Sequence, residues 1–298
     1  MSTNLGLAGI LASMTSNLNG NVLVTGSAGL LGSAICDLLT ASEVPFQTLD
    51  LNPRSHPGSL NHFIGLATDL QLLSQAIVGV KGVIHLAAIR NPDYGTPVAV
   101  FSNALATFSV LDAATRAGVD RAVIASSFSA TGLPFSEIKV ELKDLPIDES
   151  FENQVSDPYA LSKNIDELTG KYMNTRFGMR VVALRYPYIG DHIDLLPKRF
   201  TEFAKNPESG KKELWSYIDT RDAAYVAVDS ILNSDIQSGS YFVSASNILG
   251  PHPVSELIKQ FYPNVKLKSG HGKFDSLVNI SKAYSALKYH PQHNFSNE

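Results

Sequence analysis

One pattern constrains the fold of this 298-residue chain more than any other: apolar segments of strand length alternate with stretches of helical periodicity. The apolar segments are NVLVTG, PFQTLD, HFIGLATDL, GVIHLAA, RAVIASS and RVVALRY, and the longest helical stretches cover about 98–117 and 157–177. Strands that are apolar throughout lie between two layers of helices, because both of their faces are buried. The sequence therefore predicts an α/β fold with a doubly wound parallel sheet.

A glycine-rich turn, TGSAGLLG, joins the first predicted strand to the first predicted helix. We expect Gly26 to make the tight turn, Gly29 to let the backbone approach a pyrophosphate, and Gly32 to let helix and strand pack closely. The phosphates would be held by the free N–H groups at the start of the helix. Because these glycines lie between a strand and a helix, they predict a Rossmann-type dinucleotide site.

Asp50 stands at the end of the second predicted strand, in the position that selects between dinucleotides. A carboxylate there accepts hydrogen bonds from the ribose hydroxyls and repels a 2′-phosphate, which predicts NAD and disfavours NADP. Two alternatives stay open. Arg54 is able to receive a 2′-phosphate, and Asp50 is able to serve only as a cap for the turn at Asn52 and Pro53.

The domain organisation follows from where strands, helices and Pro- or Gly-rich stretches lie along the chain. We expect a tail or docked helix at 1–20 and an NAD-binding Rossmann domain at 21–186, to which 216–245 adds later elements. A small substrate-binding lobe is predicted from 187–215 and 246–298, above the carboxyl ends of the strands.

Composition disfavours several kinds of partner. A net charge of -4 without a basic run disfavours nucleic acid. No stretch approaches the roughly 20 uninterrupted apolar residues of a membrane span, so we expect no membrane association. The single cysteine, Cys36, leaves no disulfide framework or multi-cysteine metal site and is consistent with a cytoplasmic location. We expect no metal and a small-molecule substrate, and we leave a homodimer open.

Taken together, these motifs resemble the extended short-chain dehydrogenase/reductase family, which contains the NAD-dependent epimerases and dehydratases, from Asn21 to near the end of the chain. TGSAGLLG is similar to its glycine motif, HLAA to its fourth-strand motif, RAVIASSFSATG to its fifth strand and serine loop, SDPYALSK to its catalytic helix, and SYIDTRDAA to its late strand-helix junction. The resemblance implies cofactor contacts from Gly26, Gly29, Leu30, Leu31, Gly32, Asp50, Asp69, Leu70, Leu86, Ala87, Ala88, Asn103, Tyr159, Lys163 and Ile189.

Tyr159 and Lys163 are the predicted proton-transfer pair. They are four residues apart on a predicted helix and therefore share one face. A phenol is a poor base at neutral pH, and an adjacent ammonium favours its ionised form, so Tyr159 would exchange a proton with the substrate hydroxyl. The resemblance implies that Lys163 also holds the nicotinamide ribose and that Ser127 hydrogen-bonds the substrate oxygen. The alternative is a surface Tyr/Lys pair on an amphipathic helix.

The loop and lobe residues bear on which reaction takes place. Dehydratases of the family carry an Asp-Glu pair where this chain has Phe128 and Ser129, which disfavours elimination of water. Trp215 stands where sugar-nucleotide enzymes carry a diphosphate-binding arginine, and KLKSGHGKFD, ahead of Ser281-Lys282-Ala283, contains no arginine. Lysine lacks the bidentate fork that suits a phosphate. These departures favour a small polar substrate, as in the uronate-dehydrogenase-like branch.

Three functions are therefore compared. The first is an NAD-dependent oxidoreductase that moves a hydride between nicotinamide and a secondary alcohol or carbonyl of a sugar or sugar-acid-like substrate. The second is a nucleotide-sugar 4-epimerase with tightly bound NAD, and the third is a non-catalytic dinucleotide-sensing protein. Predicted substrate contacts are Phe128, Ser129, Tyr188 and Trp215, and further candidates, for which packing or surface roles are the alternative, are His192, Arg199 and Arg221.

Overall fold

The computed structural model describes residues 18, 20–92, 95–268 and 275–296. A seven-stranded sheet with the spatial order β10-β7-β5-β4-β1-β2-β3 runs through the molecule, and all of its strand pairs are parallel. Its strands are β1 (Asn21–Thr25), β2 (Phe46–Asp50), β3 (His62–Ile64), β4 (Val80–His85), β5 (Arg121–Ser127), β7 (Arg180–Tyr186) and β10 (Gly239–Phe242). The strand order reverses between β1 and β4, which is where doubly wound sheets bind their ligands. The predicted fold class is confirmed.

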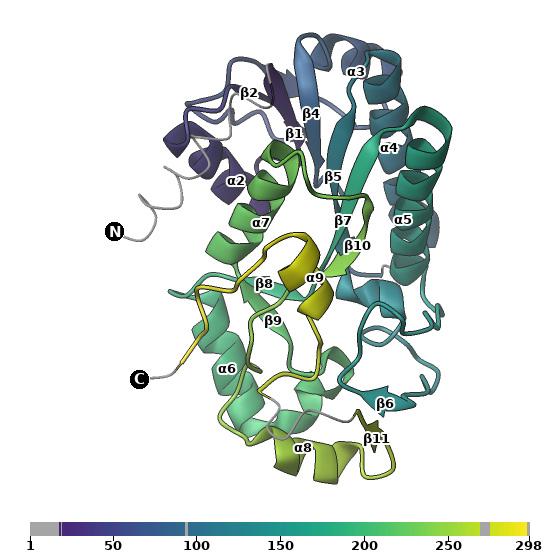
Figure 1. The fold of residues 1–298 in the computed structure, drawn as a ribbon, viewed down its shortest axis with the longest axis vertical. Helices are drawn as coiled ribbons and strands as arrows, with labels where there is room; N and C mark the ends of the chain where they lie inside the picture. Colours follow the sequence, from purple (N-terminus) through teal and green to yellow (C-terminus); the bar gives the residue numbers. More distant parts are fainter. Residues whose placement is uncertain (1–17, 19, 93–94, 269–274, 297–298) are drawn as a thin grey trace.

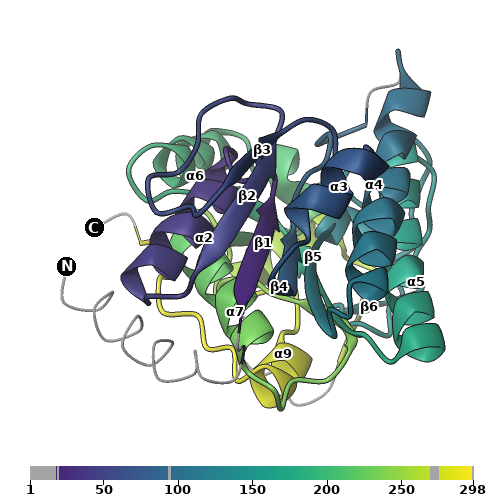
Figure 2. The same ribbon diagram turned by 90° about the horizontal axis from the view of Figure 1, so that it is seen from above.

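Helices cover both faces of the sheet (Figure 1, Figure 2). On one face α2 (Leu30–Ala41) packs beside α7 (Thr220–Leu232), and their apolar side chains share one buried core with β1 and β7. On the other face lie α3 (Leu70–Ala76), α4 (Pro97–Arg116) and α5 (Pro158–Phe177), over a second buried core. Two separate cores, one per face, explain why the strands are apolar on both sides.

The stretch LQLLSQAIVGV, residues 70–80, has helical periodicity, but the helix that forms from it, α3, is shorter. Asp69 caps the helix, because its side chain accepts hydrogen bonds from two N–H groups of the first turn. The helix ends at Ala76, however, and Gly79 then adopts a positive φ of 76° directly before β4. A left-handed residue cannot continue a helix, so Val80 enters the sheet instead.

A smaller lobe adjoins the sheet and occupies the lower half of Figure 1. It contains two short parallel pairs, β8 (Tyr188–Gly190) with β9 (Tyr217–Asp219) and β6 (Asp144–Leu145) with β11 (Lys266–Leu267). Its helices are α6 (Leu195–Lys205), α8 (Val254–Phe261) and the 3-10 segments η2 (Phe128–Thr131) and η3 (Pro207–Glu213). A third apolar core lies within this lobe.

Some segments pack in a different part of the protein from the one to which the sequence assigned them. The lobe core includes Leu133, Leu145 and Ile147, which lie within the stretch predicted to be part of the Rossmann domain. In the opposite direction, α9 (Ser281–Ala286) packs on β10, and Leu287 joins the core under α2 and α7. The loops that leave the carboxyl end of the sheet carry apolar side chains, and these side chains are buried against the apolar core of the lobe.

Two further expectations concern the chain ends and the apolar helix. The predicted tail or helix at 1–20 lies outside the described residues except for Leu18, which is buried in the core under α2, and Gly20. Among the described helices, α4 is long and apolar enough to cross a membrane by length and composition, yet 44% of its most apolar stretch is buried against the rest of the protein. A core helix passes the same test.

Candidate active site

The glycine turn after β1 has the backbone shape that the sequence predicts. Gly26 has a φ of 73°, and its N–H donates to the carbonyl of Leu49 at 2.9 Å. A Cβ on Gly32 would lie 2.2 Å from the Gly26 carbonyl oxygen, so α2 begins this close to the turn because residue 32 has no side chain. A Cβ on Gly29 would lie 3.5 Å from the same oxygen, which is ordinary contact. The protein itself therefore leaves space over Gly29, as the approach of a pyrophosphate requires.

The first turn of α2 is available to an anion. Gly29 caps the helix without any side-chain hydrogen bond, and the first N–H groups of a helix have no acceptor within it. Leu31 is buried under the turn, while Leu30 is exposed beside it. Backbone N–H groups at a helix start favour negative charge. The turn and helix start thus fit the diphosphate of NAD.

Asp50 holds the glycine turn to the second strand. Its carboxylate accepts one hydrogen bond from the N–H of Ala28 at 2.9 Å and one from the N–H of Asn52 at 2.8 Å. The second contact is the turn cap considered as an alternative. A carboxylate has about four acceptor sites, and Asp50 is partly exposed, so acceptor capacity remains for ribose hydroxyls. Arg54 lies exposed on the following loop.

The cofactor contacts predicted at Leu70 and at residues 86–88 lie at the same edge of the sheet. Leu70, next to the helix cap Asp69, is exposed. The N–H of Leu86 donates to the carbonyl of Thr25 at 3.1 Å, so the chain after β4 runs beside the glycine turn. The approach is close, because a Cβ on Gly26 would lie 2.7 Å from the backbone nitrogen of Ala87. Residues 86–88 and the glycine turn together form one continuous backbone surface.

Asn103 holds the chain after β4 in place through hydrogen bonds to the backbone of Ile89. Its side-chain oxygen accepts from the N–H of Ile89 at 2.8 Å, and its amide donates to the carbonyl of Ile89 at 2.9 Å and to Ser162 Oγ at 3.4 Å. The residue is almost completely buried. Asn103 thus fixes the chain after β4 to α4 and α5, and its predicted contact with the cofactor stays a prediction.

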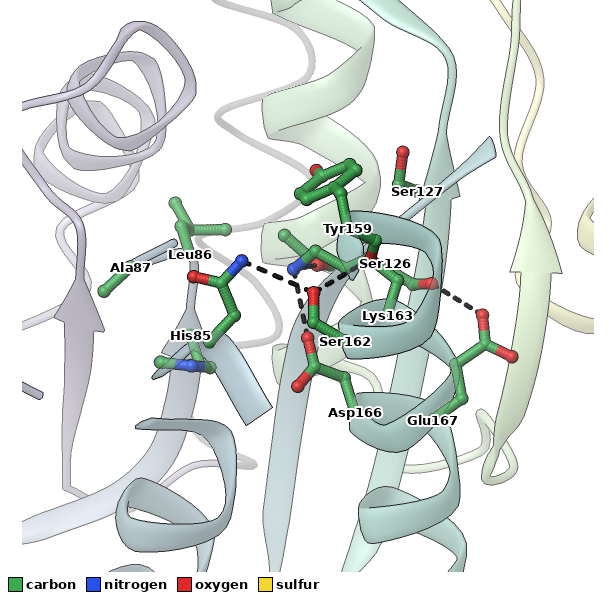
Figure 3. A network of polar contacts seen from close by, with 12 residues as sticks. His85, Leu86, Ala87, Ser126, Ser127, Tyr159, Ser162, Lys163, Asp166 and Glu167 are labelled. Carbon is green, nitrogen blue, oxygen red and sulfur yellow. Dashed lines mark hydrogen bonds and ion pairs between the residues drawn. The ribbon is translucent and has the colours of Figure 1, made fainter. Parts of the chain in front are cut away.

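The three predicted catalytic residues come together at the carboxyl end of β5. Tyr159 and Lys163 lie on α5, and the Lys163 Nζ is 5.7 Å from the centre of the Tyr159 ring. Ser127 is the last residue of β5, and its Oγ accepts from the N–H of Ser129 at 3.0 Å. In Figure 3 the side chains of Tyr159 and Ser127 lie at the same end of the sheet, and Lys163 lies beneath them. Tyr159 is mostly buried, and the ring of Phe135 packs edge-on against it at 6.1 Å.

The Lys163 ammonium is held by two acceptors. It donates to the carbonyl of Ala125 at 2.8 Å and forms an ion pair with Asp166 Oδ2 at 3.0 Å, and both side chains are buried (Figure 3). Burial works against the charged form of Lys163, but Asp166, Tyr159 and Glu167 together outweigh burial, Asp166 most strongly, and the pKa of the lysine is raised. The ammonium therefore persists in the site at neutral pH.

A second buried ion pair adjoins the first. Glu167 accepts two hydrogen bonds from the Arg185 guanidinium, both at 2.8 Å, and one each from Ser126 Oγ and Ser240 Oγ. Burial raises the pKa of Glu167, but its hydrogen bonds outweigh burial, above all those with Arg185, and the net pKa is lowered. This pair joins α5 to β5, β7 and β10. Sequence reasoning missed Asp166 and Glu167, although their spacing of three and four residues from Lys163 places them on its side of the helix.

Two predicted substrate contacts lie in the core of the lobe. Trp215 is 1% exposed, its indole N–H donates to the carbonyl of Pro207 at 2.8 Å, and its ring packs against Phe261 and Tyr262. Phe128 is 3% exposed. In place of the predicted substrate contact, the structure gives Trp215 and Phe128 a position in the apolar core of the lobe, where Phe128 packs against Phe242. Both anchor the lobe through apolar packing.

The remaining candidates for substrate or cofactor contacts differ in exposure and in charge pairing. Ser129 is buried in η2, His192 is exposed, and Ile189 is partly buried. Tyr188 is partly buried, its ring lies 5.3 Å from the Arg199 guanidinium, and burial raises the pKa of its hydroxyl, which therefore stays protonated at neutral pH. Arg199 is paired with Glu202 and Glu213, and Arg221 with Asp219.

The comparisons with known proteins agree with this geometry. Residues 22–227 match the NAD dependent epimerase/dehydratase family. UDP-glucose 4-epimerase of Rhizobium meliloti is 31% identical over 176 residues, which cover 56% of this chain and 51% of that protein. L-arabinose 1-dehydrogenase (NAD(P)(+)) of Haloferax volcanii is 30% identical over 176 residues, 56% of this chain and 66% of that protein. The chain spans about half the length of the 4-epimerases it matches.

A solved structure extends the likeness of the fold. A short-chain dehydrogenase/reductase superfamily protein from Agrobacterium tumefaciens, crystallised with bound NAD, superposes with a TM-score of 0.70 over 92% of this chain and 93% of that chain. At 22% identity this likeness shows the fold alone. The family match, which covers the glycine turn, Ser127, Tyr159 and Lys163, establishes that this chain belongs to the NAD-dependent epimerase/dehydratase family.

Proposed function

We propose that this protein is an NAD-dependent oxidoreductase that moves a hydride between nicotinamide and a secondary alcohol or carbonyl of a small, polar, sugar-like substrate. The observation that carries the proposal is the meeting of Tyr159, Lys163 and Ser127 at the carboxyl end of β5, the edge of the parallel sheet at which the glycine turn also follows β1. When bound, NAD supplies the hydride chemistry. The protein's own residues bind, orient and exchange the proton.

Each of the three side chains has a defined task in this proposal. The Tyr159 hydroxyl exchanges the proton with the substrate oxygen. The Lys163 ammonium, charged and 5.7 Å from the ring centre, favours the phenolate electrostatically. Ser127 uses its hydroxyl lone pair to cap η2, so its O–H stays available to hydrogen-bond the same substrate oxygen.

Charge pairing in the lobe supports a small substrate over a nucleotide sugar. A diphosphate is best held by free guanidinium groups. Two arginines are candidates for this task, Arg199 on α6 of the lobe and Arg221 at the start of α7, and both are paired with carboxylates. A diphosphate would have to displace those carboxylates, which disfavours the nucleotide-sugar 4-epimerase. The epimerase remains the second candidate because several relatives are named as such.

The test is turnover with NAD. Absorbance of NADH is followed with a panel of sugars and sugar acids, and UDP-glucose is assayed for 4-epimerisation in parallel. We expect oxidation of at least one small sugar or sugar acid. Tyr159→Phe should lower kcat by roughly two to four orders of magnitude while cofactor affinity stays nearly unchanged. Cofactor binding without turnover on any compound would instead favour a dinucleotide sensor.

We also propose that the protein forms a homodimer through the outer faces of α4 and α5. Exposed apolar side chains recur every three or four residues on α4, at Val98, Phe101, Leu105 and Phe108, and at spacings of seven and four residues on α5, at Leu161, Leu168 and Tyr172. Helices of 20 residues are about 30 Å long, so the two together present a face on the order of 600 Å². A stable interface covers about 800 Å² per partner, and a twofold pairing of this face comes close to that size.

Sedimentation velocity tests the dimer. The variant Leu105→Lys/Leu168→Lys places two charges in the centre of the face and should be monomeric. Leu60→Lys, at an exposed leucine before β3, is the matched control and should sediment as the wild type does. A wild-type monomer at micromolar concentration, or a dimer that persists in the double variant, would refute the proposed interface.

A further inference from the structure

Asp166 is a buried acid that the proposed chemistry does not yet use. Its Oδ2 lies 3.0 Å from Lys163 Nζ, and the two side chains are 2% and 4% exposed. Its Oδ1 is buried and has no hydrogen-bond partner among the described residues. A structural aspartate would ordinarily satisfy both oxygens. Because one carboxylate oxygen of Asp166 has no hydrogen bond within the described part of the chain, the contact of the other oxygen with Lys163 is the interaction that accounts for a carboxylate at this buried position.

The groups that face the ammonium leave Asp166 as its closest anion. His85, on β4, is neutral, because burial and then the nearby ammonium lower its pKa to about 3, and its Nδ1 lies 2.7 Å from Thr25 Oγ1. On the side of β5, the ammonium donates a hydrogen bond to the carbonyl of Ala125. Glu167 contributes more weakly because it is committed to Arg185. Tyr159 is the remaining ionisable neighbour on α5.

We infer that Asp166 is a positioning residue: it is the buried counter-ion that keeps Lys163 charged and holds its ammonium against the Ala125 carbonyl, beneath Tyr159. An ammonium has three N–H donors, and these two contacts occupy two of them. One donor is therefore left for the ribose of the cofactor. The catalytic part of this inference rests on the proposed function, whereas the pairing itself does not.

A stability cycle tests the pairing without any substrate. Melting midpoints are measured from pH 6 to 10 for the wild type, Asp166→Asn, Lys163→Met and the double variant. Without Asp166, the buried lysine should have a lowered pKa in the folded protein. Between that pKa and the ordinary lysine value, the unfolded chain of the variant binds more protons than the folded one, so the stability of the variant rises with pH. Asp166→Asn should then lower the midpoint by roughly 5–10 °C at pH 7, and by less than half as much at pH 10.

The other arms of the cycle separate pairing from general structure. In the Lys163→Met background, Asp166→Asn should have little effect or should stabilise, because an unpaired buried carboxylate is then removed. Asp112→Asn, which breaks the partly exposed pair with Arg116 on α4, is the matched control and should give a small loss that does not change with pH. An Asp166→Asn loss that is equal at pH 7 and pH 10, or equal in both backgrounds, would overturn the inference.

Kinetics test the catalytic part. With the substrate found in the turnover panel, Asp166→Asn should show kcat/KM falling on the alkaline side at a pH where the wild type is still flat, because the lysine loses its proton earlier. Unchanged profiles would remove the positioning role. If the wild type turns over nothing, the proposed function fails, and the stability cycle still decides whether Asp166 is the counter-ion of Lys163.

Discussion

Two single-methyl substitutions in the glycine turn should have opposite effects on folding and cofactor binding. In Gly32→Ala the new Cβ would lie 2.2 Å from the Gly26 carbonyl oxygen and 2.7 Å from Ser27 Cα. Both atoms are backbone, so the turn or the start of α2 has to move. In Gly29→Ala the nearest atom is 3.5 Å away, and the backbone, at φ -72° and ψ 168°, suits alanine. The first variant is strained in the free protein, and the second is not.

The magnitudes follow from this geometry. Overpacking of this kind costs about 1–3 kcal/mol. A change of 1 kcal/mol moves the midpoint by about 2–4 °C in domains of 150–250 residues, so Gly32→Ala should melt at least a few degrees lower. Gly29→Ala should melt within about 1 °C of the wild type without cofactor, because its methyl meets only an ordinary contact. Its methyl would instead meet the pyrophosphate, and we expect a loss of NAD affinity of roughly tenfold or more, about 1.4 kcal/mol.

The assay is differential scanning fluorimetry of both variants without cofactor, followed by calorimetric titration with NAD. The comparison between the two variants provides its own control, since both add one methyl group within the same turn. Wild-type NAD affinity in Gly29→Ala would show that the space over this residue does not receive the cofactor. Wild-type stability in Gly32→Ala would show that the close contact at the start of α2 is not needed.

Three further outcomes are expected. The protein should bind NAD(H) more tightly than NADP(H) in calorimetry because of Asp50, and equal or reversed affinity would mean that Arg54 governs the site. UDP and UDP-glucose should not bind the NAD-loaded protein at micromolar concentration in thermal-shift titrations, because Arg199 and Arg221 are already paired, and micromolar binding would promote the 4-epimerase to first choice. Burial raises the pKa of Asp229 to about 6, so the unfolded carboxyl ionises first and stability falls as pH rises from 4 to 6. Asp229→Asn should therefore stabilise by up to about 2–3 kcal/mol at pH 7 and not at pH 4, and a midpoint gain independent of pH would contradict this account.

The sequence by itself determined the frame of the molecule and the position of its candidate site. The strands are encoded locally by apolar runs, and the starts of α3 and α5 by the caps Asp69 and Asp157. The glycine turn, Ser127 and the Tyr159–Lys163 pair were predictable for the same reason, because each lies within a short segment whose conformation its own residues dictate. Parallel strands then bring the ends of those segments to one edge of the sheet.

Only the tertiary structure decided which of the remaining side chains face the site. Trp215 is buried because Phe261 and Tyr262, far along the chain, pack against it. Arg199 is paired with Glu213 across the turn from α6 to η3. The contact between Lys163 and Asp166 depends on β5, whose Ala125 carbonyl draws the ammonium into the protein. Burial and pairing are long-range properties, set by which surfaces meet, and a local sequence pattern does not contain that information.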